Sequence, residues 1–380
     1  MEEQLWIACK DGKAQDVIKL LQNEQININE YGGDATTPST PFWIACSNGH
    51  IEIVKLLLND ERIDINKADE DSWTPFHSAL ENRHIEIVTL LLNDERIDIN
   101  KPNGDGDGWT PYGYTSFYLA CKNGHIEIVK VLLNDKRVAI NKICNFGQTP
   151  FYVACEYGRT EIVKLLLNDP RIDVGEEEEH YANSPFYVAC ENGHSEIVKL
   201  LLEDGRCNIH VDATVLGIAC QEGHLEVVKL LLDDGRIDVE QAEYCSGRTP
   251  FYAACECGQT EIVKLMLDDE RVDVDVELRD HTPIYGACEN GHIDIVKLLL
   301  ASRREIESVN HFLKPLIAIA RERGENIENE YDESEEEECE RKKQDYQKIV
   351  ELLESFEDNP NETKMKLRIE LGQLGEIFFV

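Results

Sequence analysis

A run of oxygen-bearing side chains is the first candidate for chemistry in this sequence. Asn103, Asp105 and Asp107 alternate with glycines, as oxygen ligands do at the start of a helix-flanked calcium loop. Such a loop also needs a bidentate glutamate at its twelfth position, which here is Tyr114, and flanking helices, which we do not expect. We therefore interpret residues 103–108 as the tip of an enlarged, carboxylate-bearing loop.

Histidine and cysteine are the side chains most able to ligate a transition metal, yet their spacing argues against such a site. Six histidines recur at intervals too long to share one ion, and we predict hydrogen bonds at helix starts for them. They are His50, His84, His125, His194, His224 and His292. Cys255 and Cys257 form a Cys-x-Cys pair, but no second pair lies at zinc-finger spacing. We predict neither a metal nor another cofactor.

The motifs that usually carry catalysis are also missing from the sequence. It contains no phosphate-binding glycine-rich loop before a Lys-Ser/Thr pair, no His-Glu-x-x-His zinc motif and no Gly-x-Ser-x-Gly nucleophile elbow. Because each of these motifs places a reacting group on a defined turn or helix, their absence removes the usual routes to hydrolysis and phosphoryl transfer. We therefore predict that the chain is not an enzyme.

Composition limits the classes of partner. The chain has 38 Lys and Arg against 75 Asp and Glu, a formal net charge of -37, which disfavours nucleic acid and anionic membrane surfaces as partners. No stretch approaches the roughly 18 apolar residues of a membrane span, and Met1 to Gln4 lack the cationic start of a secretory signal. Most of the 13 cysteines share one recurring position, as buried, reduced thiols would. We expect a soluble acidic protein of the cytoplasm or the nucleus.

An internal repeat indicates the architecture that holds these residues. The segment from Thr40 to Asn66 recurs with Thr74 at its head, which gives a period of 34 residues. An alanine at the same place in each copy marks nine units, with insertions between some of them: Ala8, Ala45, Ala79, Ala120, Ala154, Ala189, Ala219, Ala254 and Ala287. Stacked units would share one continuous core.

Each unit carries the signals of two short helices. A Thr-Pro pair such as Thr40-Pro41 places a capping hydroxyl and a suitable φ at the start of the first helix. Gly49 and its copies follow soon after, where a left-handed residue commonly ends a helix. The second helix, residues 51–58, is apolar on nearly every side, so neighbouring units must cover it. A lone unit would not be stable.

The unit resembles that of the ankyrin-repeat family, in which a Thr-Pro-Leu-His-x-Ala-Ala run, a Gly-His pair and a Leu-Leu-Leu end mark two helices followed by a hairpin or loop. The resemblance covers residues 5 to about 300. Here Phe commonly replaces the Leu of the first run, Tyr or Trp replaces its His, and Cys replaces its second Ala. The resemblance implies an all-α solenoid of about ten units, each a helix–turn–helix plus a β-hairpin or loop. The Thr-Pro and Gly punctuation argues against the tetratricopeptide repeat.

The resemblance also implies where a partner binds, because ankyrin repeats usually bind partners through their hairpin tips and two exposed first-helix positions before the glycine. By alignment, the first-helix positions are Glu81, Asn82, Lys122, Asn123, Glu156, Tyr157, Glu191, Asn192, Gln221, Glu222, Glu256, Glu289 and Asn290. Phe146 and Tyr181 on neighbouring tips join Tyr157 as aromatic anchors. Acidic residues predominate, so we expect a concave face that prefers a basic or amphipathic partner; a merely solvated acidic face is the alternative.

The regular repeat pattern ends after the ninth unit. We expect three parts: the repeat array over residues 1–312, a degenerate split repeat over 313–358, and a capping helix with an apolar tail over 359–380. Pro315 to Ala320 with Gly324 imitate a first helix of the split repeat. Residues 325–340 hold ten carboxylates and no base, so we expect this insert to be disordered. Ser334 within it lies in an acidic context that suits acidophilic kinases, and we treat its phosphorylation as a hypothesis.

These patterns favour a non-catalytic scaffold, monomeric, that binds a protein partner and neither nucleic acid nor membrane. The alternative is a substrate-recruiting adaptor of an enzyme complex such as a ubiquitin ligase, in which the tail, residues 359–380, docks the catalytic partner. The simpler interpretation of that tail is that it covers the open end of the solenoid.

Overall fold

The computed structural model describes residues 1–33, 38–104, 112–174, 184–206, 214–243, 247–276, 282–329 and 336–373. The chain divides into two compact units, Met1–Val188 (unit 1) and Ala189–Val380 (unit 2). Both are built from paired helices, and within the described ranges strand pairing is limited to one isolated bridge between Gly32 and Ser39. The predicted all-α repeat architecture is therefore confirmed, with loops where the resemblance implied hairpins.

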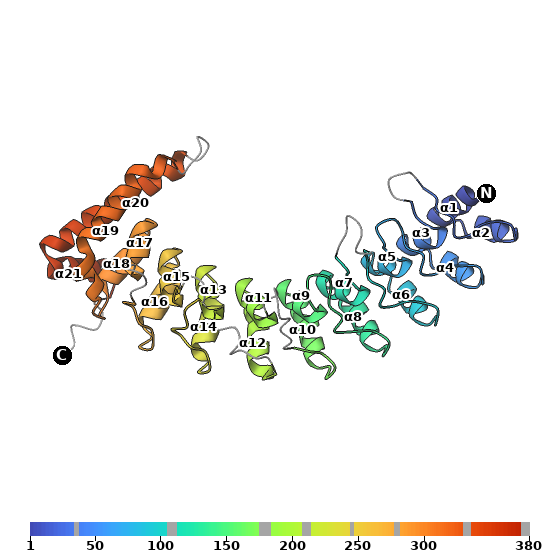
Figure 1. Ribbon diagram of the computed structural model, residues 1–380, viewed down its shortest axis with the longest axis horizontal. Helices are drawn as coiled ribbons and strands as arrows, with labels where there is room; N and C mark the ends of the chain where they lie inside the picture. The colour runs from blue at the N-terminus through green and yellow to red at the C-terminus, as the bar shows by residue number, and fades with distance from the viewer. Residues whose placement is uncertain are drawn as a thin grey trace. The chain divides into compact units, whose positions relative to one another are not determined.

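Unit 1 stacks its helices in two rows (Figure 1). The first helices of its repeats are α1 (Glu2–Lys10), α3 (Pro41–Ser47), α5 (Pro75–Glu81), α7 (Ser116–Asn123) and α9 (Pro150–Glu156). The second helices are α2 (Ala14–Leu21), α4 (Ile51–Leu58), α6 (Ile85–Leu92), α8 (Ile126–Leu133) and α10 (Thr160–Leu167). Each first helix contacts the next first helix and each second helix contacts the next second helix, so the core runs between the two rows.

Unit 2 continues the same pattern and ends in longer helices. The division of the chain falls within α11 (Pro185–Glu191). The helices that follow are α12 (Ser195–Asp204), α13 (Val215–Gln221), α14 (Leu225–Asp233), α15 (Pro250–Glu256), α16 (Thr260–Leu267), α17 (Pro283–Glu289) and α18 (Ile293–Ala301). The last elements are α19 (Glu307–Asn326), a 3₁₀ turn over Ile327–Asn329, α20 (Glu336–Asp358) and α21 (Pro360–Glu370). No helix in the described ranges is long and apolar enough to cross a membrane.

The first helices begin and end at the residues that the sequence predicted. The Thr40 hydroxyl accepts a 3.1 Å hydrogen bond from the backbone N–H of Trp43, which satisfies a donor at the helix start. Gly49 has a φ of 75°, the left-handed conformation that glycine adopts without strain. Arg83 stands at the equivalent position of the next repeat with a φ of 60°, so that one repeat keeps the turn without glycine.

The recurring small and aromatic residues fill the core. Phe42, Ala45 and Cys46 of α3 are fully buried, and their counterparts in the other repeats are buried as well. Burial raises the pKa of the Cys46 thiol well above its usual value, because a thiolate would lose its hydration there. These thiols are therefore packing residues, as the sequence predicted for the recurrent cysteines.

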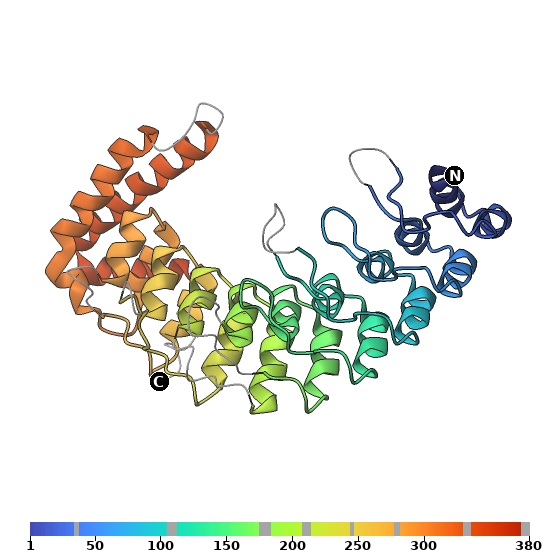
Figure 2. The ribbon, with the colours of Figure 1, turned by 45° about the vertical axis from the view of Figure 1, so that its right-hand side comes forward.

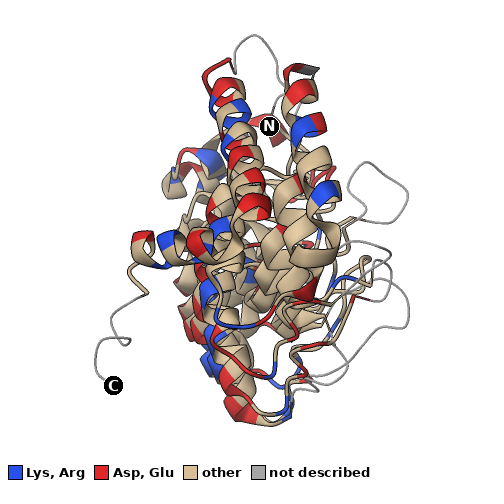
Figure 3. Cartoon of the chain, turned by 90° about the vertical axis from the view of Figure 1, so that its left-hand side faces the viewer, with Lys and Arg blue, Asp and Glu red and all other residues tan. Residues whose placement is uncertain are grey.

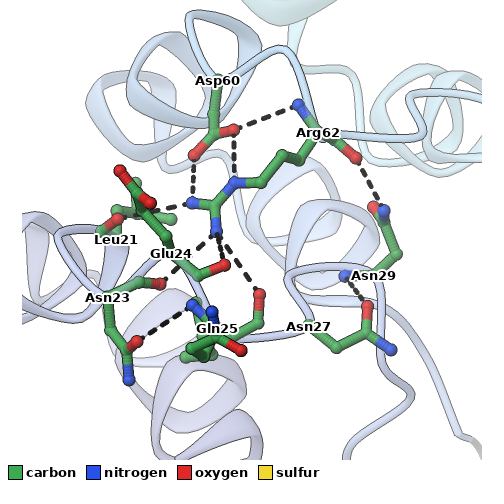
Figure 4. Close-up of polar contacts among 9 residues, drawn as sticks. Leu21, Asn23, Glu24, Gln25, Asn27, Asn29, Asp60 and Arg62 are labelled. Atoms are coloured by element: carbon green, nitrogen blue, oxygen red, sulfur yellow. Dashed lines mark hydrogen bonds and ion pairs between the residues drawn. The ribbon is translucent and has the colours of Figure 1, made fainter.

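An arginine of the next repeat contacts the end of six of the described second helices, α2, α4, α6, α8, α12 and α14, a role that sequence reasoning did not predict; Figure 4 shows the first of them. The guanidinium of Arg62 makes two hydrogen bonds to Asp60, at 2.9 and 2.6 Å. It also donates to the carbonyl of Leu21, the last residue of α2, at 3.3 Å and to that of Glu24 in the following loop at 3.2 Å. The last carbonyls of a helix lack partners within it and carry its negative dipole end, so a cation is favourable there. Equivalent carbonyl contacts are made by Arg96, Arg137, Arg171, Arg236 and Arg271.

An asparagine ladder connects the loops of unit 1. The Asn66 side chain donates to the carbonyl of Arg96 at 2.7 Å and accepts from the N–H of Asp98 at 2.8 Å. Asn29, Asn100 and Asn141 make the same pair of bonds to the following repeat. Because one side-chain amide supplies both a donor and an acceptor, the ladder joins the loops of successive repeats without β-strand pairing.

The C-terminal hairpin differs from the predicted split repeat (Figures 1 and 2). Helices α19 and α20 pack along each other, with Leu316 and Ala320 of α19 and Ile349 and Leu353 of α20 fully buried. Gly324 lies inside α19 instead of ending a short helix, and a Cβ there would lie 2.9 Å from the Cβ of Tyr346. Its lack of a side chain thus lets the two helices approach closely.

The expected disorder of residues 325–340 is a prediction that the structure corrects in part. Residues 325–329 end α19 and form the 3₁₀ turn, and residues 336–340 begin α20; residues 330–335, with Ser334, lie outside the described residues. Bases beyond the insert stabilise these turns, since Lys343 pairs with Glu328 and Arg341 pairs with Glu338. Acidic and basic residues both occur along this hairpin (Figure 3), and acidic residues in a first turn favour a helix.

The last described helix, α21, lies against α18 and α20. Arg368 donates from its side chain to the carbonyls of Ala301 and Ser302, both at 2.9 Å, and Lys297 pairs with Glu370 at 2.7 Å. These contacts attach α21 to the end of the repeat array through the free carbonyls of α18. The apolar end of the tail, residues 374–380, lies outside the described residues.

Candidate functional site

The predicted first-helix positions, which we call the binding row, lie at the C-terminal ends of the first helices. In unit 1 the row runs over α5, α7 and α9, and in unit 2 it runs from the end of α11 over α13, α15 and α17. The exposed members are Glu81, Asn82, Tyr157, Asn192, Gln221 and Glu222. The half-buried members are Lys122, Asn123, Glu156, Glu191, Glu256, Glu289 and Asn290.

The backbone of the binding row is held by the next repeat. In unit 1 the side chain of Arg159 donates to the carbonyl of Lys122 at 2.8 Å, and at the equivalent place on α3, before the row begins, the Nε2 atom of His84 lies 2.9 Å from the carbonyl of Ser47. In unit 2, His224 and His292 contact the carbonyls of Glu191 and Glu256 at 2.8 and 2.9 Å. A carbonyl only accepts, so these imidazoles carry their proton on Nε2.

These contacts correct the predicted role of the recurrent histidines. Their side chains make no capping bond at their own helix starts. His50, His84, His224 and His292 bond instead to the last residue of the preceding first helix, and His125 accepts a 3.1 Å hydrogen bond from the side chain of Arg83. The position of the imidazole explains the difference. The ring of His84 lies over Gly49 of the preceding repeat, where a Cβ would be only 2.6 Å from Cε1 of the histidine. The imidazole therefore occupies the space over the glycine and satisfies a helix-end carbonyl. The row is consequently presented on a rigid backbone.

The binding row of unit 1 lies beside a group of aromatic rings. Tyr114 stacks on Tyr112 and on Tyr118, with ring centroids 5.2 and 4.5 Å apart, and Phe146 lies 5.9 Å from Tyr112. The two loops that carry these rings are joined by a 3.0 Å hydrogen bond from the N–H of Asn145 to the carbonyl of Tyr112. With Tyr157, these rings form what we call the aromatic cluster: Tyr112, Tyr114, Tyr118, Phe146 and Tyr157.

Lys122 connects this cluster to the binding row. Its ammonium lies 5.0 Å from the ring centroid of Tyr114 and 5.4 Å from that of Tyr157, distances at which a cation is attracted to an aromatic face. Next to it, the side chain of Asn123 donates a 2.7 Å hydrogen bond to Glu81. The structure thus brings together predicted row members from α5, α7 and α9.

The outer rings of the aromatic cluster are accessible. Tyr112 is 41% exposed, Phe146 is 52% exposed and Tyr157 is 44% exposed. Tyr118, by contrast, is buried and its hydroxyl donates to Gln148 at 2.8 Å, so it fixes the stack from below. An apolar surface on a rigid base, with satisfied polar groups beneath, is typical of a protein-binding surface.

The binding row of unit 2 is acidic but partly neutralised. Glu256 pairs with Arg248 at 3.0 Å, and Glu289 pairs with Arg323. Burial, followed by repulsion from Glu222, raises the pKa of Glu191 above its usual value. The negative charge that remains for a partner is therefore concentrated near α11 and α13, which favours a cation at that place.

Sequence reasoning missed Tyr112 and Tyr114 as members of the site. Their spacing by two residues was a usable signal, because alternate residues of an extended segment face the same side. Asp105 and Asp107 of the same loop, which the alternation with glycine singled out, lie outside the described residues. The predicted anchor Tyr181 lies outside them as well. Among the described residues, no group of three or more His, Cys, Asp or Glu is placed to hold a metal ion.

Comparison with known proteins identifies the repeat. A sequence model of the family described as Ankyrin repeats (3 copies) matches residues 5–103, 104–178, 172–243 and 236–310. These matches cover most of the chain and coincide with the paired helices α1 to α18. The comparison with curated proteins found no significant match.

Proposed function

Because the chain belongs to the ankyrin-repeat family, we propose that it is a non-catalytic scaffold that binds a protein partner through the aromatic cluster and the binding row. Repeats of this family suggest protein binding as a class of function, and the matched repeats are typical of non-catalytic proteins. The partner and the residues that contact it are the specific part of the proposal.

The observation that carries the proposal is the exposure of three aromatic rings on a rigid support. Tyr112, Phe146 and Tyr157 are each at least 41% exposed, although their size and apolar area favour burial. Aromatic side chains supply much of the binding energy at protein interfaces, and truncation of a central one commonly costs about 2 kcal/mol or more. The cluster therefore has the composition of an interface centre.

The charges of the binding row indicate the kind of partner. In unit 1, Glu81 on α5 and Glu156 on α9 lie on the first helices either side of α7, and the row of unit 2 carries Glu191 and Glu222. Opposite charge on a partner would increase the rate of encounter and select against acidic competitors. A basic or amphipathic segment, with an apolar side chain for the rings, fits both features.

The test is affinity capture from cells that express the protein, followed by binding measurements with the purified captured partner. A triple variant, Tyr112→Ala with Phe146→Ala and Tyr157→Ala, is expected to weaken binding by at least about 30-fold, which corresponds to about 2 kcal/mol. The matched control is Met365→Ala with Ile369→Ala, which removes apolar surface that is 47% and 58% exposed on α21 of unit 2. Equal binding by the triple variant and the control would contradict the proposal.

A second variant tests the charge preference separately. Replacing Glu156, Glu191 and Glu222 with lysine changes the local charge by six units and leaves the buried core intact. We expect slower association and a weaker dependence on salt with a basic partner. An unchanged list of captured proteins would exclude the charge preference while leaving the aromatic cluster to be judged by the triple variant.

A further inference from the structure

Unit 1 contains a second feature, a cleft that is separate from the aromatic cluster. It has a volume of about 790 Å³ and lies between α1, α3 and the turn over residues 69–73. Trp6, Trp43 and Trp73 line it, and they are three of the four tryptophans in the chain. None of these residues belongs to the binding row, so the cleft calls for its own explanation.

The indoles of Trp6 and Trp43 are held through their N–H groups; Trp6 is only 8% exposed, whereas Trp43 and Trp73 are half-buried, so the ring surface for a ligand comes mainly from Trp43 and Trp73. The indole N–H of Trp43 donates to the carbonyl of Trp73 at 2.9 Å, and that of Trp6 donates to the hydroxyl of Ser39 at 3.2 Å. Both polar atoms of these indoles are therefore satisfied within the protein. A ligand in the cleft meets aromatic carbon, and an aromatic face attracts cations.

The charges that line the cleft point to a cation as well. Glu3, Asp69, Glu70 and Asp71 contribute four carboxylates against the single ammonium of Lys10. None of the four forms an ion pair within the described part of the chain. Asp69 is half-buried, and its oxygen accepts from the backbone N–H groups of Trp73 and Asp71 at 2.8 and 3.1 Å, so it is held in place.

Lys10 shows that the Trp6 ring already attracts a cation. Its Nζ atom lies 5.1 Å from the ring centroid, within the range of a cation–π contact. Lys10 is exposed, and its flexible chain is free to leave the ring when a stronger ligand enters. The contact between Lys10 and Trp6 therefore indicates that a ligand of this cleft carries a positive charge.

We propose that this cleft binds an arginine side chain in a basic segment of a partner protein. A guanidinium is planar and stacks on indole rings, and its five donors match carboxylates in pairs. A compact, strongly hydrated ammonium uses neither property as well. The proposal rests on the proposed function only in that its ligand is a polypeptide, because it uses different residues of unit 1.

The test uses the full chain with Trp109→Phe, so that tryptophan fluorescence comes from the three cleft residues alone. The probe is an acetylated heptapeptide in which arginine alternates with glycine, titrated at about 0.15 M salt to screen distant charges. Matched peptides carry lysine or uncharged citrulline in place of arginine. We expect saturable quenching by the arginine peptide, weaker binding of the lysine peptide, and none by the citrulline peptide. Equal binding of the lysine peptide would overturn the assignment of a guanidinium.

Variants locate the binding and separate it from general attraction to an acidic protein. Trp73→Leu and the exposed pair Glu70→Gln with Asp71→Asn are each expected to weaken binding at least about fivefold. The exposed pair keeps the test valid if the tryptophan variant does not fold. The matched control, Glu127→Gln with Glu161→Gln on the second helices of unit 1, removes the same charge elsewhere. Equal loss in the control and in the cleft variants would overturn the proposal.

The same titration distinguishes this site from the proposed function. The triple variant of Tyr112, Phe146 and Tyr157 is expected to bind the arginine peptide as the parent does, because none of these rings lines the cleft. A loss of peptide binding in that variant would assign the peptide to the aromatic cluster and overturn the cleft proposal. If it binds the peptide normally but still captures its partner, the proposed function fails while the cleft stands.

Discussion

The hydroxyl of Tyr346 donates a 2.8 Å hydrogen bond to the carbonyl of Glu289. In the repeats, a histidine, arginine or glutamine makes this contact to the preceding first helix; here a tyrosine from the non-repeat helix α20 makes it. Its ring also covers Gly291, where a Cβ would lie 3.1 Å from Cζ of the tyrosine. The C-terminal hairpin thus attaches to the last repeat through the same contact that joins one repeat to the next.

This relationship predicts how unit 2 responds to changes at Tyr346. Tyr346→Phe removes one hydrogen bond and is expected to lower the free energy of unfolding by about 1 kcal/mol. Tyr346→Ala also empties a buried site and is expected to cost about 3–5 kcal/mol. Urea unfolding followed by circular dichroism measures both. Equal stability of the alanine variant and the parent would show that the hairpin attaches by other contacts.

The glycine beneath each histidine gives a second prediction with a matched control. Gly49 and Gly205 have similar φ angles, 75° and 71°, but a Cβ meets His84 only at Gly49 and meets nothing within 4 Å at Gly205. Both alanine variants lose about 1 kcal/mol from backbone strain, and Gly49→Ala is expected to lose more because the imidazole must move.

Thermal unfolding of the two alanine variants tests this difference. Adding His84→Ala to Gly49→Ala should recover part of the loss at that glycine, since the clash disappears. If Gly205→Ala were as damaging as Gly49→Ala, packing of the histidine would have no part in the effect of the substitution at Gly49.

The features of this fold that the sequence predicts are those set by residues close together in the chain. Thr40 and Gly49 bound a helix by local chemistry, so the repeat was predictable from a single unit. The helical ends of the insert were not, because carboxylates there pair with bases that lie beyond it, as Glu328 does with Lys343 and Glu338 with Arg341. A local window over residues 325–340 contains the repulsion and none of the compensation.

The site was predictable to a similar degree. The binding row follows from the repeat alignment, and Phe146 and Tyr157 were predicted as anchors. Tyr112 and Tyr114 were not, because their loop reaches Phe146 only through contacts between two repeats, such as the bond from Asn145 to Tyr112. The repeat period and the composition of a single loop do not predict which loops of different repeats contact each other.

The arginine links predict a dependence of stability on acid. Hydrogen bonds from Arg96 lower the pKa of Asp94 from its usual 3.8, and the arginine two residues on does the same for Asp60, Asp135, Asp169, Asp204 and Asp269. A lowered folded pKa adds stability above the unfolded value, and that stability is lost as pH falls through the folded pKa. We therefore expect the free energy of unfolding to fall below about pH 4.

Chemical unfolding between pH 2 and pH 7 measures this dependence. Asp94→Asn cannot titrate, so its variant should lose less stability in acid than the parent loses. A parent protein that is most stable near pH 3 would contradict the role assigned to these pairs. Because the pairs lie near the surface, each contributes modestly and the sum is measured more readily than one pair.

Asp69 titrates in the opposite sense. Burial, reinforced by the charge of Asp71, raises its pKa to about 6 from 3.8. A raised carboxyl pKa in the folded state means that folding takes up protons between these values, so the contribution of Asp69 to stability decreases as pH rises from about 4 to 6. Asp69→Asn keeps an oxygen for the turn and should remove this decrease. Direct titration by NMR that places Asp69 below pH 4 would contradict the prediction.

Hydrogen exchange of the purified protein with and without its captured partner tests the central claim most directly. If the aromatic cluster and the binding row hold the partner, backbone protection should increase in peptides that contain Tyr112, Phe146 or Tyr157 and little along the second helices α4, α6 and α8. Protection confined to those second helices, with exchange around the aromatic cluster unchanged, would contradict the account.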